Sequence, residues 1–125
     1  MTLSLIFAVA LLDTVRPARD SGIRINSDQP LIELQACAMR KLSHGADVLP
    51  IPIDGGVDVD WVPRTNFGVA GDAPFTLRIR EVGGRREIAA YYRHPFSMKA
   101  IQNMVRDVGN RCFPRELAVW ESQPH

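Results

Sequence analysis

Residues 97–112 carry the most regular apolar pattern in the chain, and they restrict its fold more than any other segment. Their apolar side chains recur at spacings of three and four residues, which places them on one stripe of an α-helix. These residues are Met98, Ile101, Val105, Val108 and Cys112. Ser97 is a suitable N-cap because its oxygen can accept a free backbone N–H of the first turn, and Pro114 cannot continue the helix. The pattern predicts an amphipathic helix whose last inward residue is a cysteine.

The only other cysteine, Cys37, falls on the second amphipathic segment, residues 29–42. Asp28 or Ser27 is the expected cap of this helix, with Pro30 in its first turn, where a missing N–H does no harm. The inward stripe consists of Leu31, Leu34, Cys37, Ala38 and Leu42. Each predicted helix therefore presents one cysteine to whatever it packs on.

Residues 48–63 have the alternation of a β-hairpin. A three-residue loop at 54–56 would pair Ile53 with Val57, Ile51 with Val59 and Leu49 with Trp61, and would put all six apolar side chains on one face. Two prolines, at 50 and 52, remove N–H groups from the same side of the first strand. This strand is therefore expected at a sheet edge, with Asp58 and Asp60 as equivalent, solvent-facing carboxylates on the other strand.

Residues 75–92 form a second predicted hairpin. A two-residue turn at Gly83-Gly84 pairs Ile79 with Ile88, Leu77 with Ala90 and Phe75 with Tyr92, because diglycine allows the positive φ angles that a tight turn requires. On the other face of this hairpin Arg80 meets Glu87 and Thr76 meets Tyr91.

The expected fold class is α+β, a four-stranded antiparallel sheet of two hairpins with two helices packed on one face, in the order α-β-β-β-β-α. Residues 21–27 are interpreted as a linker or a strand leading into the fold. Residues 64–73 are expected to be a loop, and residues 114–120 allow a short helix before a frayed tail.

Two helices on one sheet face can bring Cys37 and Cys112 together, and a disulfide closing a loop of about 75 residues would stabilise the fold by roughly 4–5 kcal/mol. The alternative is two buried free thiols in a cytosolic core.

The N-terminal segment bears on the compartment. Residues 3–12 are apolar without interruption. They are too short to span a bilayer, which needs about 20 residues, but they match the apolar region of a signal peptide. The match lacks a preceding Lys or Arg and a good small-residue cleavage site, so a buried first strand or helix stays open as an alternative. Because the length of the apolar run fits a signal peptide, we expect one at 1–18 and a single domain at 19–125. This domain is expected to be periplasmic or secreted and to have no transmembrane anchor.

The composition and motifs exclude several function classes. The net charge is +1, which gives no global attraction to nucleic acid or to an anionic membrane. The three histidines have no metal-ligand spacing, and no phosphate-binding, dinucleotide-binding or nucleophile motif occurs. The sequence predicts no metal and no cofactor, and it favours a protein that is not an enzyme.

The strongest candidate surface is the sheet face turned away from the helices. Arg78, Arg80, Tyr91 and Arg93 are expected there, and arginines beside an aromatic ring are typical of single-strand nucleic-acid platforms. One aromatic residue is too few to stack several bases, and Asp58 and Asp60 on the adjoining strand can neutralise the arginines. His94, between the sheet and the last helix, is a possible pH-sensitive group.

These observations predict a small exported, disulfide-stapled domain with a non-catalytic binding or accessory role. An acidic protein, a glycan or a surface lipid is the expected kind of partner, and nucleic acid is disfavoured. The alternative is a cytosolic nucleic-acid or protein-binding module that uses the basic sheet face.

Overall fold

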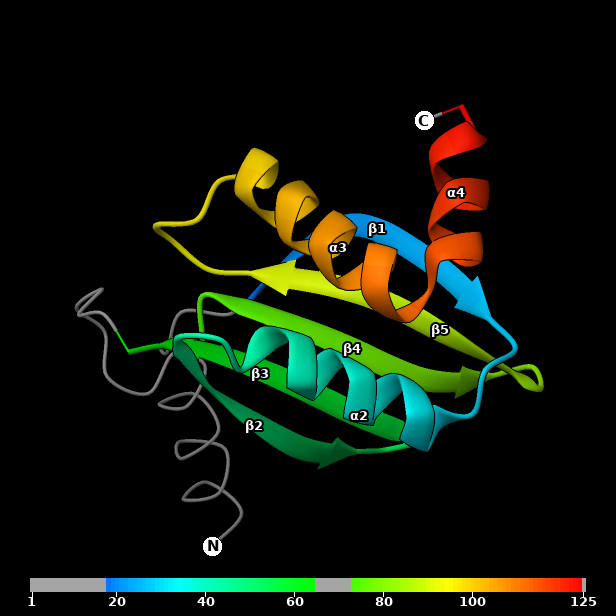
Figure 1. The fold of residues 1–125 in the computed structure, drawn as a ribbon, viewed down its shortest axis with the longest axis horizontal. Helices are drawn as coiled ribbons and strands as arrows, with labels where there is room; N and C mark the ends of the chain where they lie inside the picture. The colour runs from blue at the N-terminus through cyan, green and yellow to red at the C-terminus, as the bar shows by residue number, and fades with distance from the viewer. Residues whose placement is uncertain (1–17, 65–72, 125) are drawn as a thin grey trace, which may run out of the picture.

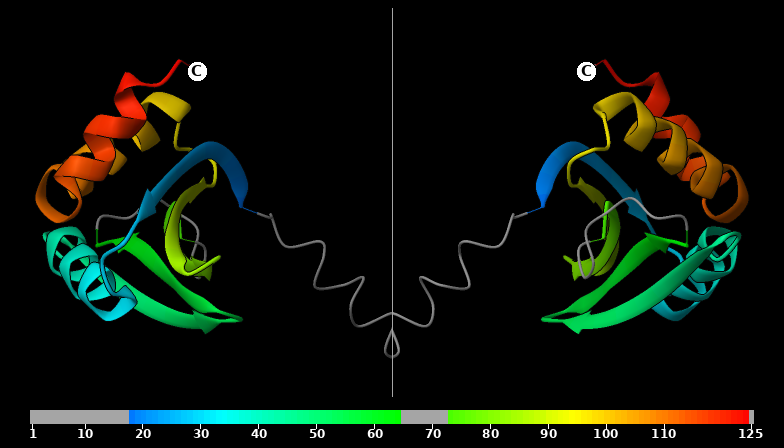
Figure 2. Two further views of the ribbon diagram at one scale, coloured as in Figure 1. Left: turned by 90° about the vertical axis from the view of Figure 1, so that its right-hand side faces the viewer. Right: turned by 90° about the vertical axis from the view of Figure 1, so that its left-hand side faces the viewer.

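The computed structural model describes residues 18–64 and 73–124. In chain order, its elements are β1 (Arg19–Ser27), α2 (Leu31–Leu42), β2 (Ala46–Ile53), β3 (Gly56–Pro63), β4 (Phe75–Val82), β5 (Arg85–Tyr92), α3 (Met98–Cys112) and α4 (Pro114–Ser122). The strands form one antiparallel sheet in the order β1-β5-β4-β3-β2. The three helices of the described part lie on one face of this twisted sheet and leave the other face open (Figure 1, Figure 2). Residues 1–17 of the expected signal peptide lie outside the described residues.

The α+β class is confirmed, but the predicted count of four strands and two helices was wrong. The segment interpreted as a linker or an entry strand is β1, an edge strand of the sheet paired with β5. Ile23 and Ile25 are buried against the helices, while Arg24 and Asn26 alternate with them on the open side. This two-residue period was present in the sequence, but its polar members obscured it. The third helix, α4, begins directly after Phe113, so Pro114 starts a new helix as well as ending α3.

The core lies between the sheet and the helix layer. From α2 it takes Leu34, Ala38 and Leu42, and from α3 it takes Ile101, Val105, Val108 and Cys112. The Ser97 cap is confirmed, since its Oγ accepts the backbone N–H of Ala100 at 3.2 Å. The expected side-chain cap of α2 is absent, because Pro30 occupies the N-cap position of that helix. Ser27 Oγ instead accepts the N–H of Gln29 just before the helix, at 3.1 Å.

The 75–92 hairpin has the predicted register. Ile79 lies opposite Ile88, and Arg80 lies opposite Glu87. Gly83 and Gly84 both have positive φ, at 59° and 79°. Residues other than glycine rarely adopt such angles. In this hairpin the turn and the apolar pattern require the same register.

The 48–63 hairpin has a different register from the predicted one. Its turn is the two residues Asp54 and Gly55, so Ile53 lies opposite Gly56 and Ile51 lies opposite Asp58. Gly56 belongs to β3, where an added Cβ would lie 2.0 Å from the carbonyl oxygen of Ile79 on β4. Since only glycine fits there, Gly56 is fixed in the strand and is not available to the loop.

This register places Leu49, Ile51 and Ile53 of β2 on the open face, while Ala46 and Val48 face the core. Leu49 is 52% exposed and Ile51 is 43% exposed, although both were expected in the core. The edge position of β2 is confirmed. Its ladder with β3 can use the N–H groups of alternate residues, and Pro50 and Pro52 then leave the outer edge short of donors. The edge is therefore a poor template for another strand.

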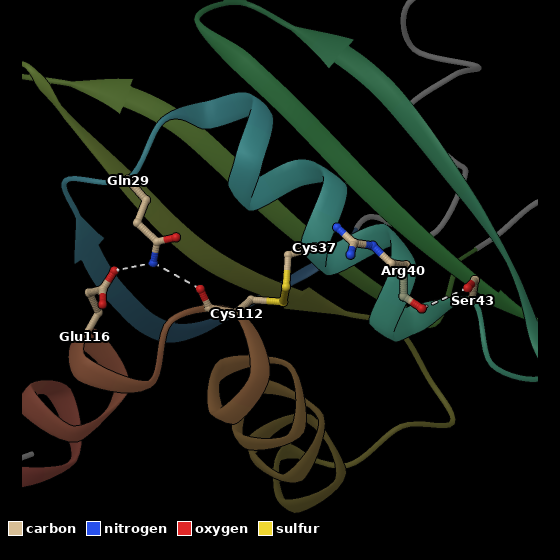
Figure 3. Close-up of a disulfide and its surroundings, with 6 residues drawn as sticks. All are labelled: Gln29, Cys37, Arg40, Ser43, Cys112 and Glu116. Carbon is tan, nitrogen blue, oxygen red and sulfur yellow. Dashed lines mark hydrogen bonds between the residues drawn. A yellow bond between two sulfur atoms is a disulfide. The ribbon is translucent and has the colours of Figure 1, made fainter.

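The predicted disulfide is confirmed. Cys37 and Cys112 are bonded at 2.07 Å with a Cα–Cα distance of 5.7 Å, and they are 75 residues apart in the chain. The bond joins the middle of α2 to the end of α3 (Figure 3). Among the described helices, none is both long and apolar enough to span a bilayer.

Candidate functional site

The structure brings together two of the four residues predicted for the open sheet face. The Arg78 guanidinium lies over the Tyr91 ring, 4.5 Å from its centroid. Arg24 of β1 lies 5.7 Å from the same centroid. Sequence reasoning missed Arg24 because it did not place β1 in the sheet. The ring of Tyr91 therefore contacts two cations that belong to its own chain.

These cations are paired with carboxylates. Arg78 donates from Nε and Nη2 to the two oxygens of Asp58, at 2.7 and 3.0 Å. The hydrogen bond with Asp58 raises the pKa of Arg78 above its usual value. Arg24 pairs with Asp20, and its side-chain hydrogen bond lowers the pKa of that carboxyl. The open face consequently presents less positive charge than its arginines alone would supply.

The expectation that Asp58 and Asp60 are equivalent was wrong. The side chain of Asp58 is 16% exposed and is held by Arg78. Asp60 accepts a hydrogen bond from Thr76 Oγ1 at 2.7 Å, and burial raises its pKa. The two carboxylates therefore have different hydrogen-bond partners.

The other predicted residues lie around this pair. Arg80 is exposed on the same face and makes no ion pair with any residue that the structure describes. Arg93 follows β5, where its Nη1 donates to the carbonyl oxygen of Ala73 at 3.0 Å. His94 is exposed in the turn before α3. Of these three residues, Arg93 is held by its own chain, and Arg80 and His94 are exposed.

A second group of cations lies in the helix layer, next to the disulfide. An open hollow of about 430 Å³ is lined by Cys37, Arg40, Lys41, His44 and Arg111. Arg40 and Lys41 come from the last turn of α2, and Arg111 comes from the last turn of α3. Figure 3 shows Arg40 on the same helix as Cys37, close to the bond that ties α2 to α3. We call these five residues the cationic hollow.

Among the described residues, the cations of this hollow have no acidic partner. Within residues 18–64 and 73–124, Arg40, Lys41 and Arg111 make no ion pair. A cation in the last turn of a helix interacts favourably with the helix dipole, which explains their positions locally. That interaction does not neutralise them, so three like charges around one concavity attract anions.

A smaller hollow of about 220 Å³ adjoins this one and shares Lys41 and His44 with it. Apolar side chains line much of its wall, namely Leu42, Trp61, Met104 and Val108, and Asp107 is its acidic member. Trp61 is held against Phe96, with the ring centroids 5.4 Å apart. A ligand anchored by the cations could therefore place an apolar part here.

A half-buried polar network links the start of α2 to the end of α3 and to α4. Gln29 donates through Nε2 to the carbonyl oxygen of Cys112 at 3.0 Å and to Glu116 at 2.9 Å, as drawn in Figure 3. Ser27, which is fully buried, donates to the same Glu116 oxygen. Burial alone would raise the pKa of Glu116, but these hydrogen bonds lower it overall. The start of α2 is thereby tied to the end of α3 and to α4.

Sequence reasoning found the disulfide but missed the cationic hollow. The available signal was basic residues near both cysteines: Arg40 and Lys41 follow Cys37 by three and four positions, and Arg111 immediately precedes Cys112. Sequence reasoning assigned none of these three residues to a site. In the described residues, no three His, Cys, Asp or Glu side chains lie close enough to hold a metal ion. Comparison of the chain with protein-family models, with curated proteins and with solved structures finds no match.

Proposed function

We propose that this chain is a disulfide-stapled binding domain, and that its cationic hollow binds a small anionic ligand bearing carboxylate or phosphate groups. The observation that carries the proposal is the set of three cations without acidic partners, among the described residues, around one concavity. This role is non-catalytic, as the sequence favours.

The size and chemistry of the hollow support this ligand class. A volume of about 430 Å³ is in the range of small-molecule sites. Arg40 and Arg111 each offer a planar fork of donors that matches a carboxylate or a phosphate. The disulfide holds the two helices that carry them, so a ligand meets a site that is already formed.

The disulfide also supports the proposal that the domain works outside the cytosol. Disulfides persist in oxidising compartments and are rare where thiols are kept reduced. The intact mass of the protein from its native source tests this point. We expect the first 18 or so residues to be missing, as signal cleavage requires. A mass that includes them would contradict export through a cleaved signal.

Nucleic-acid or protein binding by the open sheet face is the alternative function. The ring of Tyr91 is already engaged by Arg24 and Arg78 of its own chain, so it offers little free surface for a base to stack on. Asp58 also occupies the fork of Arg78 that a phosphate would need. The cationic hollow is therefore the better-supported surface.

Titration with citrate, followed by amide NMR shifts at low salt, tests the proposed site. We expect saturable shifts at Lys41, His44 and Arg111, and weaker binding as salt rises. The double variant R40Q/R111Q should lose these shifts. The matched control R80Q/K99Q removes the same charge from exposed positions elsewhere and should keep them.

Two results would refute the proposal. One is citrate shifts that cluster on the open sheet face rather than at the hollow. The other is equal weakening by both double variants, which would mean that citrate responds only to net charge.

A further inference from the structure

One cysteine of the disulfide lines the cationic hollow, and the two cysteines are not equally exposed. Cys37 is half-buried and lines the hollow beside Arg40 and Lys41. Cys112 is only 6% exposed and belongs to the core. A molecule that enters the hollow therefore meets the bond from the Cys37 side.

We propose that the cationic hollow is a site of thiol–disulfide exchange for small anionic thiols, with Cys37 as the sulfur that is attacked. This inference rests on the proposed function, since the cations that hold an anion also hold an anionic thiol. It adds a reaction to that binding.

The small thiol is itself the reductant in this exchange. The thiolate sulfur attacks Cys37 Sγ, a new disulfide forms between them, and the bond between Cys37 and Cys112 breaks. Cys112 leaves with the electron pair as a thiolate and takes a proton from the solvent. A second thiolate then attacks the small-molecule sulfur of the mixed disulfide and releases Cys37. In total, two thiols are oxidised to one small disulfide and the protein disulfide is reduced.

The charges around Cys37 favour this reaction for anions. Arg40, Lys41 and Arg111 raise the local concentration of a negatively charged thiol and repel a positively charged one. They also stabilise the negative charge that spreads over the reacting sulfurs. Since focusing by a charged concavity changes encounter rates by about tenfold or more, we expect at least a tenfold preference for an anionic over a cationic thiol.

Three small thiols of different charge test the proposal: mercaptoacetate, mercaptoethanol and cysteamine. Each is mixed with the oxidised protein at low salt, the products are trapped with an alkylating agent, and intact mass gives the rate of mixed-disulfide formation. Division by the rate of the same thiol with hydroxyethyl disulfide removes differences in thiolate content and nucleophilicity.

We expect the corrected rates to fall in the order mercaptoacetate, mercaptoethanol, cysteamine, and peptide mapping to place the adduct on Cys37. The preference should shrink severalfold in R40Q/R111Q and persist in R80Q/K99Q. Equal corrected rates for the three thiols, an adduct on Cys112, or the same loss of preference in both double variants would overturn the proposal.

Methylthioacetate, which carries the carboxylate but cannot exchange, separates this inference from the proposed function. If it shifts the amides of the hollow while the thiols show no charge preference, exchange is refuted and anion binding stands. If it shifts none of them and citrate also fails, the proposed function is refuted as well.

Discussion

The two groups of cations in this protein differ in what faces them. On the open sheet face, Arg78 is held by both oxygens of Asp58, and Arg24 is held by Asp20. In the helix layer, Arg40 and Arg111 border a hollow and have no acidic partner among the described residues.

This difference separates charges that stabilise the fold from charges that are available to a ligand. A half-buried, doubly hydrogen-bonded pair is costly to disrupt, because the remaining partner keeps its desolvation without its bonds. An exposed, unpaired cation costs little to remove. Stability and ligand binding should therefore respond to different substitutions.

Removal of the disulfide tests the framework that holds the cationic hollow. The double variant C37A/C112A should lose about 2–5 kcal/mol of unfolding free energy, mainly because the unfolded chain is no longer constrained. Urea denaturation measures this loss, and citrate binding should weaken with it as α2 and α3 are freed. Reduced wild-type protein is the control, since it lacks the bond but keeps both side chains. An unchanged midpoint in both would show that the bond does not stabilise the fold.

The parts of the fold that sequence predicted are those in which several local signals agree. In α3, the apolar stripe, the Ser97 cap and the following Pro114 all indicate the same helix. In the β4–β5 hairpin, the turn glycines and the alternation require one register. The disulfide follows once both helices are placed on one sheet face.

The parts that sequence could not predict depend on neighbours distant in the chain. Gly56 is fixed in β3 by the approach of Ile79 on β4, and no pattern within the β2–β3 hairpin contains that contact. The exposure of Ile51 follows from it, because a shift of one residue reverses the face of every side chain. The cationic hollow is equally non-local, since Arg40 and Arg111 meet only after α2 and α3 are joined.

The paired cations of the open sheet face, Arg24 and Arg78, are tested most directly at Asp58. D58N should lower the unfolding free energy by about 1–3 kcal/mol, because Arg78 loses its charged partner while staying half-buried. Chemical denaturation of D58N, R78Q and the double variant completes a double-mutant cycle, which measures the coupling energy of the pair. The double variant should lose less than the sum of the single losses. Additive losses would mean that the pair contributes no coupling energy. As a control, citrate binding at the cationic hollow should be unchanged in all three variants.

Glu116 gives a pH dependence to the network that links the start of α2 to the end of α3. Its pKa in the folded protein is below the ordinary value of 4.5, so its stabilising effect is complete above that pH and is lost as the pH falls through the folded value. E116Q, which cannot ionise, should be less stable than wild type by about 1 kcal/mol at neutral pH. Denaturation curves at several pH values should show the difference shrinking below pH 4.5. A constant difference would contradict the lowered pKa.

Substitution of Arg40 or Arg111 in the cationic hollow should give the smallest change in stability. R40Q and R111Q are each expected within about 0.5 kcal/mol of wild type, because neither side chain is buried and neither leaves a buried partner behind. Each single variant should nevertheless weaken citrate binding in the NMR titration, since each removes one of the cations around the hollow. R80Q, an exposed arginine on the other sheet face, is the matched control for both measurements. If R40Q or R111Q were as destabilising as D58N, these cations would have a structural role, and the separation between the two groups would not hold.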